Sequence, residues 1–334
     1  ALDSTSRSGA TAREWMSSGK WLTVASRKPR NRPRAQTVVA THNPSEDAPS
    51  DNIGVTPYYA EHHSARYRRQ QAIRAIEEKT GRRLIVYYSD VDSINSFDVA
   101  PFEELCLDCE EGSDVDLLIQ TNGGDADAAE KLVYLIRSRC SALRVIVVER
   151  AKSAGTMMAL GADVILMGKT SELGPIDPQI TVPLGQGRTI HRPAQSFLDG
   201  LKRIMDETNA NPGASLNPVY YPMLSEIDAA LIDYCHKSIE RSKQFARKWL
   251  RKHMLRGNTK KAASIAEALT NVKRYSSHGI AIDAAEAVAL GLKVQVLDRD
   301  DAHWRMLWEL FLMYQVGDAE RNKFFESRKV SLVF

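Results

Sequence analysis

Two short motifs constrain the fold of this 334-residue chain more than any other feature of its sequence. The first is Thr121-Asn122-Gly123-Gly124-Asp125, and the second is Lys152-Ser153-Ala154-Gly155-Thr156, in which Ser153 lies 29 residues after Gly124. Each motif follows an apolar segment of strand length, residues 115–120 and 143–149, and precedes a segment with helical spacing, residues 128–139 and 156–161. A strand, a turn and a helix in this order, twice over, predict a parallel α/β architecture.

The glycine pair has a chemical interpretation as well as a structural one. Adjacent glycines leave backbone N–H groups open to a ligand, because no Cβ blocks the approach and φ can be positive. Beside a helix N-terminus, such donors can stabilise a developing negative charge. A turn in which Gly123 and Gly124 only permit the bend is the simpler alternative. The lone serine at the start of the next helix favours an oxyanion hole that serves a nucleophile.

Several motifs together resemble the Clp protease and crotonase superfamily, and within it the branch of signal-peptide peptidase A and the serine dehydrogenase proteinases. They are residues 121–125, 151–156, 158–163, 171–179, 277–279 and 286–292. The resemblance runs from about residue 84 to about residue 297. It implies a fold of repeated ββα units around a parallel sheet. It also implies a serine-type peptidase, a hydrolase that cleaves extended polypeptide through an acyl-enzyme on Ser153.

The resemblance suggests a catalytic set in which two roles have changed places. A serine nucleophile needs a base and a group that orients the base. In Clp proteases the histidine stands in an Ile-His-Gln-Pro sequence, whereas the matching segment here is Ile176-Asp177-Pro178-Gln179. The loop that carries the aspartate in Clp proteases holds His278 instead. We therefore expect Ser153 as nucleophile, His278 as general base and Asp177 as the carboxylate that fixes the histidine tautomer.

The same resemblance places the oxyanion donors among the backbone N–H groups of Gly123, Gly124 and Ala154. It also offers a rival base, because signal-peptide peptidase A uses a serine–lysine pair and Lys202 lies 49 residues after Ser153. A lysine acts as a base only where burial or charge lowers its pKa. The charged neighbours of Lys202 in the sequence predict a solvent-exposed helix instead. We expect Lys152 to point away from the serine, and His191 is a candidate substrate-loop residue.

Composition bounds the remaining classes of function. A net charge of +3 gives no strong signal for nucleic acid, and no apolar run approaches the roughly 20 residues that span a bilayer. The first residues lack the apolar core of a signal peptide, although the chain does not begin with Met, so a cytoplasmic location is the default. The four cysteines form no secreted disulfide framework, and the single Cys106-Leu107-Asp108-Cys109 lacks a second pair at zinc-site spacing. We expect neither a metal nor a cofactor.

Three regions are expected along the chain. Residues 1–55 form a basic arm and linker, which either grips an acidic partner or a neighbouring subunit or remains a solvated tail. Residues 56–297 form the catalytic domain, and residues 298–334 form a helical extension. Trp304, Trp308 and Phe311 make an aromatic stripe on that extension, suited to a core or a subunit interface. A homo-oligomer is therefore expected, with an ATPase or other protein partner left open.

Two functions from other classes stay open at this point. A crotonase-type enzyme would hold the enolate of an acyl thioester in the same glycine-turn oxyanion hole. A catalytically silent scaffold would bind peptide or assemble a partner. A serine at the start of the second helix speaks against the crotonase chemistry, which needs an acid–base carboxylate and no covalent nucleophile.

Overall fold

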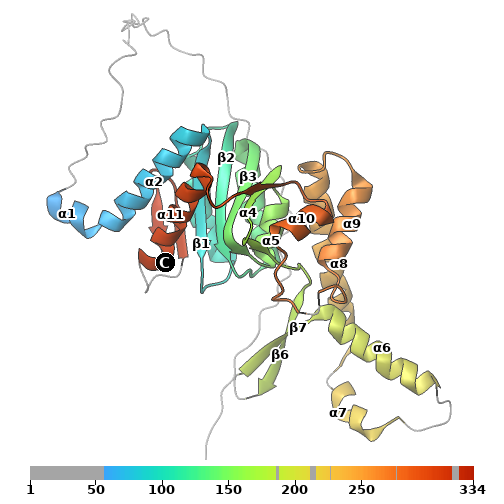
Figure 1. The fold of residues 1–334 in the computed structure, drawn as a ribbon. Coiled ribbons are helices and arrows are strands. Elements are labelled where there is room, and N and C mark those ends of the chain that lie inside the picture. Colours follow the sequence, from blue (N-terminus) through green and yellow to red (C-terminus); the bar gives the residue numbers. More distant parts are fainter. Residues whose placement is uncertain (1–55, 186–187, 211–215, 226, 276, 318–322) are drawn as a thin grey trace, which may run out of the picture. The chain divides into compact units, whose positions relative to one another are not determined.

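The computed structural model describes residues 56–185, 188–210, 216–225, 227–275, 277–317 and 323–334 (Figure 1). The expected basic arm, residues 1–55, lies outside the described residues. The helices are α1 Pro57–His62, α2 Ser64–Thr80, α3 Val99–Leu107, α4 Ala126–Arg139, α5 Ala154–Leu160, α6 Ala194–Ala210, α7 Tyr221–Leu224, α8 Ala229–Lys252, α9 Thr259–Leu269, α10 Ala284–Leu290 and α11 Ala302–Gly317. Short 3-10 turns occur at Ser96–Asp98 and Pro218–Tyr220.

The strands of the main sheet follow the order β10-β9-β1-β2-β3-β4-β8, with the short β5 beside β3. Their bounds are β1 Arg83–Ser89, β2 Ser113–Thr121, β3 Cys140–Ala151, β4 Val164–Gly168, β5 Glu172–Leu173, β8 Val294–Leu297, β9 Lys323–Glu326 and β10 Ser331–Val333. Strands β1, β2, β3, β4 and β8 run parallel, whereas β9 pairs antiparallel with β1. The predicted parallel α/β architecture is confirmed.

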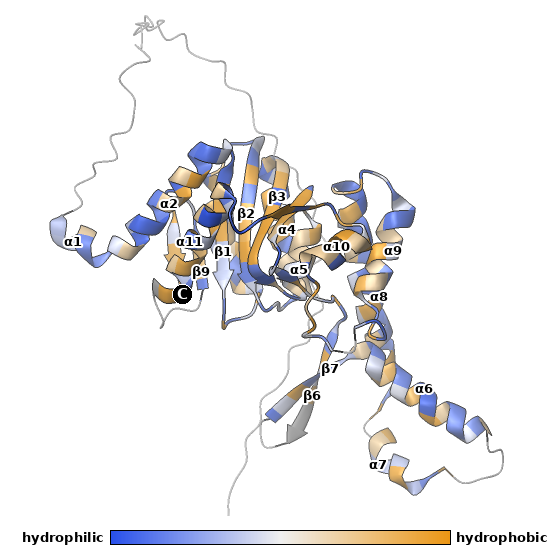
Figure 2. Cartoon of the chain, viewed as in Figure 1, coloured by the Kyte–Doolittle hydropathy of each residue, from blue (hydrophilic) through white to orange (hydrophobic). Residues whose placement is uncertain are grey.

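Alternate residues of each strand face two separate cores. On β1, Leu84 and Val86 pack with α2 and α11, while Ile85 and Tyr87 face α3 and α4. Helices cover both faces of the sheet, so its central strands are rich in apolar residues, which Figure 2 shows in orange on β2 and β3 between polar positions. This is why the strand segments at residues 115–120 and 143–149 could be predicted from their apolar runs.

The C-terminal region differs from the expected helical extension. It is helical from Ala302 to Gly317, but β9 and β10 follow and extend the edge of the sheet. The aromatic stripe also lies mostly inside the molecule, because Trp304 and Phe311 are 7% and 1% exposed against the sheet. Of the stripe, Trp308 keeps 41% of its surface exposed. The stripe is therefore chiefly core, and it does not supply the uncovered surface from which an oligomer was expected.

Two other features lie outside the main sheet. The apolar spacing of residues 58–81 predicts one helix, but the structure divides it into α1 and α2 at His63, whose φ is −108° and ψ is 20°. After Asp177, β6 Gln179–Gly185 and β7 Arg188–Pro193 form an antiparallel hairpin. The hairpin joins α6 and α8 through a small cluster around Ile180, Ala194 and Cys235.

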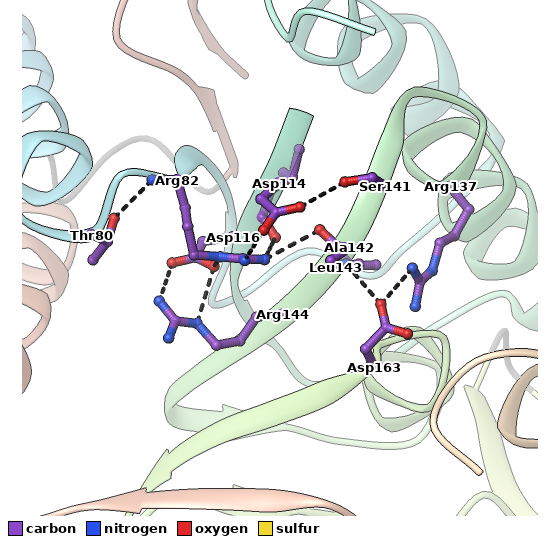
Figure 3. A network of polar contacts seen from close by, with 11 residues as sticks. Thr80, Arg82, Asp114, Asp116, Arg137, Ser141, Ala142, Leu143, Arg144 and Asp163 are labelled. Carbon is purple, nitrogen blue, oxygen red and sulfur yellow. Dashed lines mark hydrogen bonds and ion pairs between the residues drawn. The ribbon is translucent and has the colours of Figure 1, made fainter. Parts of the chain in front are cut away.

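A network of ion pairs connects the central strands near their amino ends (Figure 3). The buried Asp116 carboxylate accepts from Arg82 Nε at 2.6 Å and from Arg144 Nη2 at 2.5 Å. Asp114 pairs with Arg82 at 2.8 Å but is half-exposed. A buried carboxylate with two guanidinium partners links β2 to the start of β1 and to β3. Ser153 follows the opposite end of β3, so this network is structural.

Candidate active site

Ser153 stands between the end of β3 and the first residue of α5. Its φ of 49° and ψ of −114° are unusual for a residue with a side chain. Hydrogen bonds hold the backbone on either side, from Lys152 N–H to Thr121 O at 3.0 Å and from Gly155 N–H to Lys152 O at 2.7 Å. This sharp strand-to-helix turn presents the serine hydroxyl beside a helix N-terminus.

The glycine turn packs against a neighbouring segment so closely that only glycine fits. Gly123 and Gly124 have φ values of 107° and 144°. Ile94 N–H donates to Gly123 O at 2.8 Å, and Asp125 N–H donates to Ile94 O at 2.8 Å. A Cβ on Gly124 would lie 2.3 Å from Ile94 O. The sequence therefore needs glycine at position 124 for steric reasons as well as for its backbone conformation.

The pairing with Ile94 also decides where the turn's own donors point. In a parallel bridge the residues that flank the paired residue make the bonds, so the Gly124 N–H is directed away from Ile94. Gly124 is exposed in the cleft that Ser153 lines. The Ala154 N–H belongs to the first turn of α5, where no intrahelical acceptor exists. The Gly123 N–H, by contrast, donates to Thr121 Oγ1 at 3.0 Å.

Asp177 and His278 meet although they are 101 residues apart. The His278 Nδ1 lies 2.7 Å from Asp177 Oδ1, and Gln179 Nε2 donates to the other carboxylate oxygen at 2.7 Å. The Asp177 side chain is 5% exposed and that of His278 is 27% exposed. A carboxylate on Nδ1 holds the tautomer whose Nε2 can accept a proton.

Backbone pairing explains how the two loops come together. Leu173 N–H donates to Ile282 O at 2.9 Å, and Ile282 N–H donates back to Leu173 O at 3.0 Å. The Thr156 hydroxyl of α5 accepts from Gly174 N–H at 2.9 Å. The loop that carries Asp177 is thus tied both to the loop of His278 and to the helix that begins after Ser153.

Ser153, Asp177 and His278 line one cleft of about 720 Å³, together with Gly124. Met157 and Ile176 supply apolar lining. Helix α8 contributes a polar wall that was not identified from the sequence, made of Tyr234, Ser238, Arg241 and Ser242. Polar residues at helical spacing are typical of a solvated face, so the sequence carried no signal that would separate this wall from an exposed surface.

The remaining candidates from the sequence, Lys202, Lys152 and His191, have different surroundings. Lys202 is on α6, 73% exposed and paired with Asp206 at 2.7 Å, and it does not line the cleft. Lys152 pairs with Glu172 at 2.6 Å, as expected for a side chain that points away from the serine. His191 lies on β7, lines the cleft and contacts Thr181 Oγ1 through Nδ1 at 3.2 Å.

A second polar cluster supports the residue just before the glycine turn. Arg150 Nε donates to Asn122 Oδ1 at 2.7 Å, and Asn122 Nδ2 donates to Asp90 O at 2.7 Å. Arg150 also pairs with the Asp90 carboxylate. These contacts join the carboxyl ends of β1, β2 and β3, and they were not predicted from the sequence.

Within the described ranges, no group of three or more His, Cys, Asp or Glu residues could hold a metal ion. Cys106 and Cys109 are buried in and beside α3, and burial raises the pKa of Cys109 to about 12 and that of Cys106 well above its usual range. Such thiols stay protonated and react poorly. No helix in the described part of the chain is both long and apolar enough to cross a bilayer.

One family model and two sequence relatives match this chain. The model of a family described as ClpP-like SDH-type serine proteinase matches residues 53–316. An uncharacterized protein of Methanocaldococcus jannaschii is 26% identical over 243 residues, which are 69% of this chain and 73% of that protein. A second one from the same organism is 31% identical over 123 residues, which are 34% of this chain and 43% of that protein.

Two solved structures align over most of their own length. A mutant of a membrane-bound stomatin-specific protease has a TM-score of 0.39 at 17% identity, covering 68% of this chain and 84% of that one. ClpP1 from Listeria monocytogenes has a TM-score of 0.38 at 12% identity, covering 69% of this chain and 97% of that one.

Proposed function

The chain belongs to the family of ClpP-like SDH-type serine proteinases, and we propose that it is a peptidase that cleaves extended polypeptide through an acyl-enzyme on Ser153. One observation carries the proposal beyond the family. The buried Asp177 carboxylate holds His278 by a 2.7 Å hydrogen bond in the same cleft as a serine on a strained strand-to-helix turn. A nucleophile, a base and an orienting carboxylate are what acyl transfer by serine requires.

In the proposed reaction the Ser153 hydroxyl attacks the scissile carbonyl while His278 Nε2 takes its proton. The tetrahedral oxyanion is held by the N–H groups of Gly124 and Ala154, because the Gly123 N–H is already bonded to Thr121. His278 then gives the proton to the leaving amine, and the ester that remains is hydrolysed by water through the same groups. Asp177 keeps the imidazole in the reactive tautomer and stabilises its protonated form.

Labelling by a fluorophosphonate probe tests the nucleophile directly. The wild-type chain should be labelled and Ser153→Ala should not, while Ser238→Ala, which removes another serine of the same cleft, should keep the labelling. Unchanged labelling of Ser153→Ala would contradict the proposal. A thioesterase or hydratase activity without labelling would point to crotonase-type chemistry, and peptide binding without turnover would point to a silent scaffold.

The base is tested by kinetics on a peptide substrate. His278→Ala should lower kcat by several orders of magnitude, and Asp177→Asn should lower it by about 10⁴-fold, as loss of tautomer control does in serine proteases. Lys202→Ala should leave kcat close to the wild-type value, because that lysine is exposed and paired outside the cleft. An essential Lys202 with a dispensable His278 would move the enzyme to a serine–lysine mechanism.

A further inference from the structure

Lys323 is the first residue of β9, and its side-chain amine is buried against residues 92–98, which lie more than 200 positions earlier in the sequence. Its side chain is 4% exposed, and Nζ lies 2.7 Å from Asp98 Oδ1 and 3.0 Å from Asp92 Oδ2. The same amine donates to Ser93 O at 2.8 Å. All three contacts fall within residues 92–98, the connection that follows β1.

The position of Lys323 is set by the C-terminal hairpin of β9 and β10. Strand β9 pairs with the edge of β1 and with β10. Its Glu326 carboxylate is fully buried, accepts from Arg69 at 2.8 and 3.0 Å, and accepts from Tyr314 Oη at 2.6 Å. These bonds tie the hairpin to α2 and α11, so the Lys323 amine is held by a rigid support.

Asp98, at the end of the same connection of residues 92–98, holds it in place through further hydrogen bonds. Its buried carboxylate accepts from Tyr87 Oη at 2.8 Å and from Asn95 N–H at 3.0 Å. The Lys323 amine supplies the positive charge that pairs with this buried carboxylate. Without the amine, the carboxylate would be buried with no cation beside it, which a protein relieves by moving the group toward water.

Ile94 links this segment to the proposed active site. It lies between Ser93, whose carbonyl binds Lys323, and Asn95, whose N–H binds Asp98. Ile94 N–H donates to Gly123 O, and Ile94 O accepts from Asp125 N–H, both at 2.8 Å. Because these bonds use the flanking Gly123 O and Asp125 N–H, the bridge leaves the Gly124 N–H facing away from Ile94, and Gly124 lines the cleft.

We propose that Lys323 is a positioning residue for the oxyanion donor of Gly124, acting through residues 92–98. The inference rests on the proposed function, since it assigns a catalytic purpose to the glycine turn. Glycines have a wide choice of backbone conformations, so Gly123 and Gly124 need outside support to keep one donor in place. The C-terminal hairpin, which carries none of the cleft residues, provides that support and makes the end of the chain necessary for full activity.

The first measurement is amide hydrogen exchange in the full chain, which does not depend on catalysis. Lys323→Met should speed the exchange of the Ile94 and Asp125 N–H groups, because both form the bridge. Lys329→Met is the matched control: it makes the same change in the same hairpin, but Lys329 is 63% exposed and pairs with Asp108 at 3.4 Å. The control should leave both amides protected as in the wild type.

The second measurement separates transition-state binding from substrate binding. Lys323→Met should lower kcat by about 10- to 100-fold, less than the 10²- to 10³-fold cost of removing an oxyanion donor. In the Ser153→Ala background, its affinity for an uncleaved peptide should remain unchanged. With Ser153 intact, affinity for a peptide aldehyde, which forms a tetrahedral adduct with the Ser153 hydroxyl, should fall in Lys323→Met by the same factor as kcat.

A double variant covers the case in which Lys323→Met does not fold. Lys323→Met with Asp98→Asn leaves no unpaired buried charge, yet it still lacks the bond to Ser93 O, so faster exchange and lower kcat are expected again. Unchanged exchange at Ile94 and Asp125 would overturn the inference, and so would faster exchange with unchanged kcat. An inactive wild type would contradict the proposed function, while the exchange result would still decide whether Lys323 holds the turn.

Discussion

Ser153 occupies a backbone conformation that glycine adopts with far less strain. For residues with a side chain, such conformations cost about 1–3 kcal/mol and persist where the surroundings enforce them. Here the enforcing contacts are the hydrogen bonds of Lys152 and Gly155 and the close packing of Gly123, whose added Cβ would lie 2.8 Å from Ser153 Cβ. The strain is consistent with a side chain that is held in place for chemistry.

This strain predicts an unusual order of stability among variants at position 153. Ser153→Gly should be more stable than Ser153→Ala, by about 1 kcal/mol after the entropic cost of glycine is included. The free energies of urea unfolding provide the measurement. At position 238, inside α8, the order should reverse, with Ser238→Ala more stable than Ser238→Gly. Equal stability of the two variants at position 153 would show that the turn is not strained.

His253 predicts how the fold responds to acid. Burial, assisted by the nearby Arg137 charge, lowers the pKa of His253 to about 4 in the folded chain, against about 6.5 in an unfolded one. The unfolded state therefore binds a proton first as the pH falls, so stability should decrease between about pH 6.5 and about pH 4. Urea midpoints measured across this range should show the loss.

The variant His253→Gln should reduce that pH dependence, because the titrating group is gone. His236→Gln, which replaces an exposed histidine within α8, the helix that ends just before His253, should keep the wild-type behaviour. Asp163 adds a second acid-sensitive group at lower pH. Its burial is outweighed by the Leu143 N–H bond and by Arg137, so the pKa of Asp163 is lowered and its contribution is lost only below the ordinary carboxyl range. If the unfolding free energy of His253→Gln depends on pH as steeply as that of the wild type between about pH 6.5 and about pH 4, His253 is not the group responsible.

At the scale of elements, the ion-pair network shows how the strands β1, β2 and β3 are held in register at their amino ends. Asp116→Ala should destabilise the fold by about 3–5 kcal/mol, because two arginine side chains that are only 18% and 17% exposed lose their shared buried carboxylate. Asp114→Ala should cost at most about 1 kcal/mol, since Asp114 is 47% exposed. Chemical denaturation of the two variants makes the comparison. Similar losses of unfolding free energy in the two variants would contradict the conclusion that burial makes the Asp116 ion pairs the more important ones.

The C-terminal hairpin of β9 and β10 could not be predicted from the sequence. Its strands contain three and four residues, and the apolar pair Phe324-Phe325 is too short to show a period. The unpaired edge of β1 provides the hydrogen-bonding partners, and that edge exists only in the folded sheet. Phe324 then joins the core of α2 and α11, while Phe325 joins the opposite core.

At the scale of the whole molecule, the described residues leave apolar side chains uncovered around α7 and α6. Val219, Tyr221 and Met223 are 63%, 55% and 57% exposed, and Met205 is 55% exposed. Surfaces of this kind favour association between copies. We therefore expect a homo-oligomer that uses these residues in place of the largely buried aromatic stripe.

Light scattering at micromolar concentration measures the assembly. The mass should be a multiple of the 37.3 kDa chain, and Tyr221→Lys with Met223→Lys should shift it toward the monomer. Trp308→Lys, a matched change on the remaining exposed part of the stripe, should leave the mass unaltered. A monodisperse monomer of the unmodified chain would exclude the expected assembly.

The sequence by itself determined the parallel architecture and the two turns at its carboxyl edge. Apolar runs buried on both faces are recognisable without any tertiary information, and glycine at position 124 is required locally by a positive φ. The segments that carry Asp177 and His278 could be assigned only through the resemblance to a family, because a role in catalysis leaves no periodic signal.

Only the tertiary structure decided which groups meet. The contact of His278 with Asp177 depends on a backbone pairing between Leu173 and Ile282, and the bridge at Gly124 depends on Ile94. The helical pattern of residues 227–256 predicts a helix, which α8 confirms, but it does not predict that the polar face of this helix lines the cleft. Such contacts join residues about 30 to more than 200 positions apart, and their geometry is set by packing of the whole sheet, which local propensity does not encode.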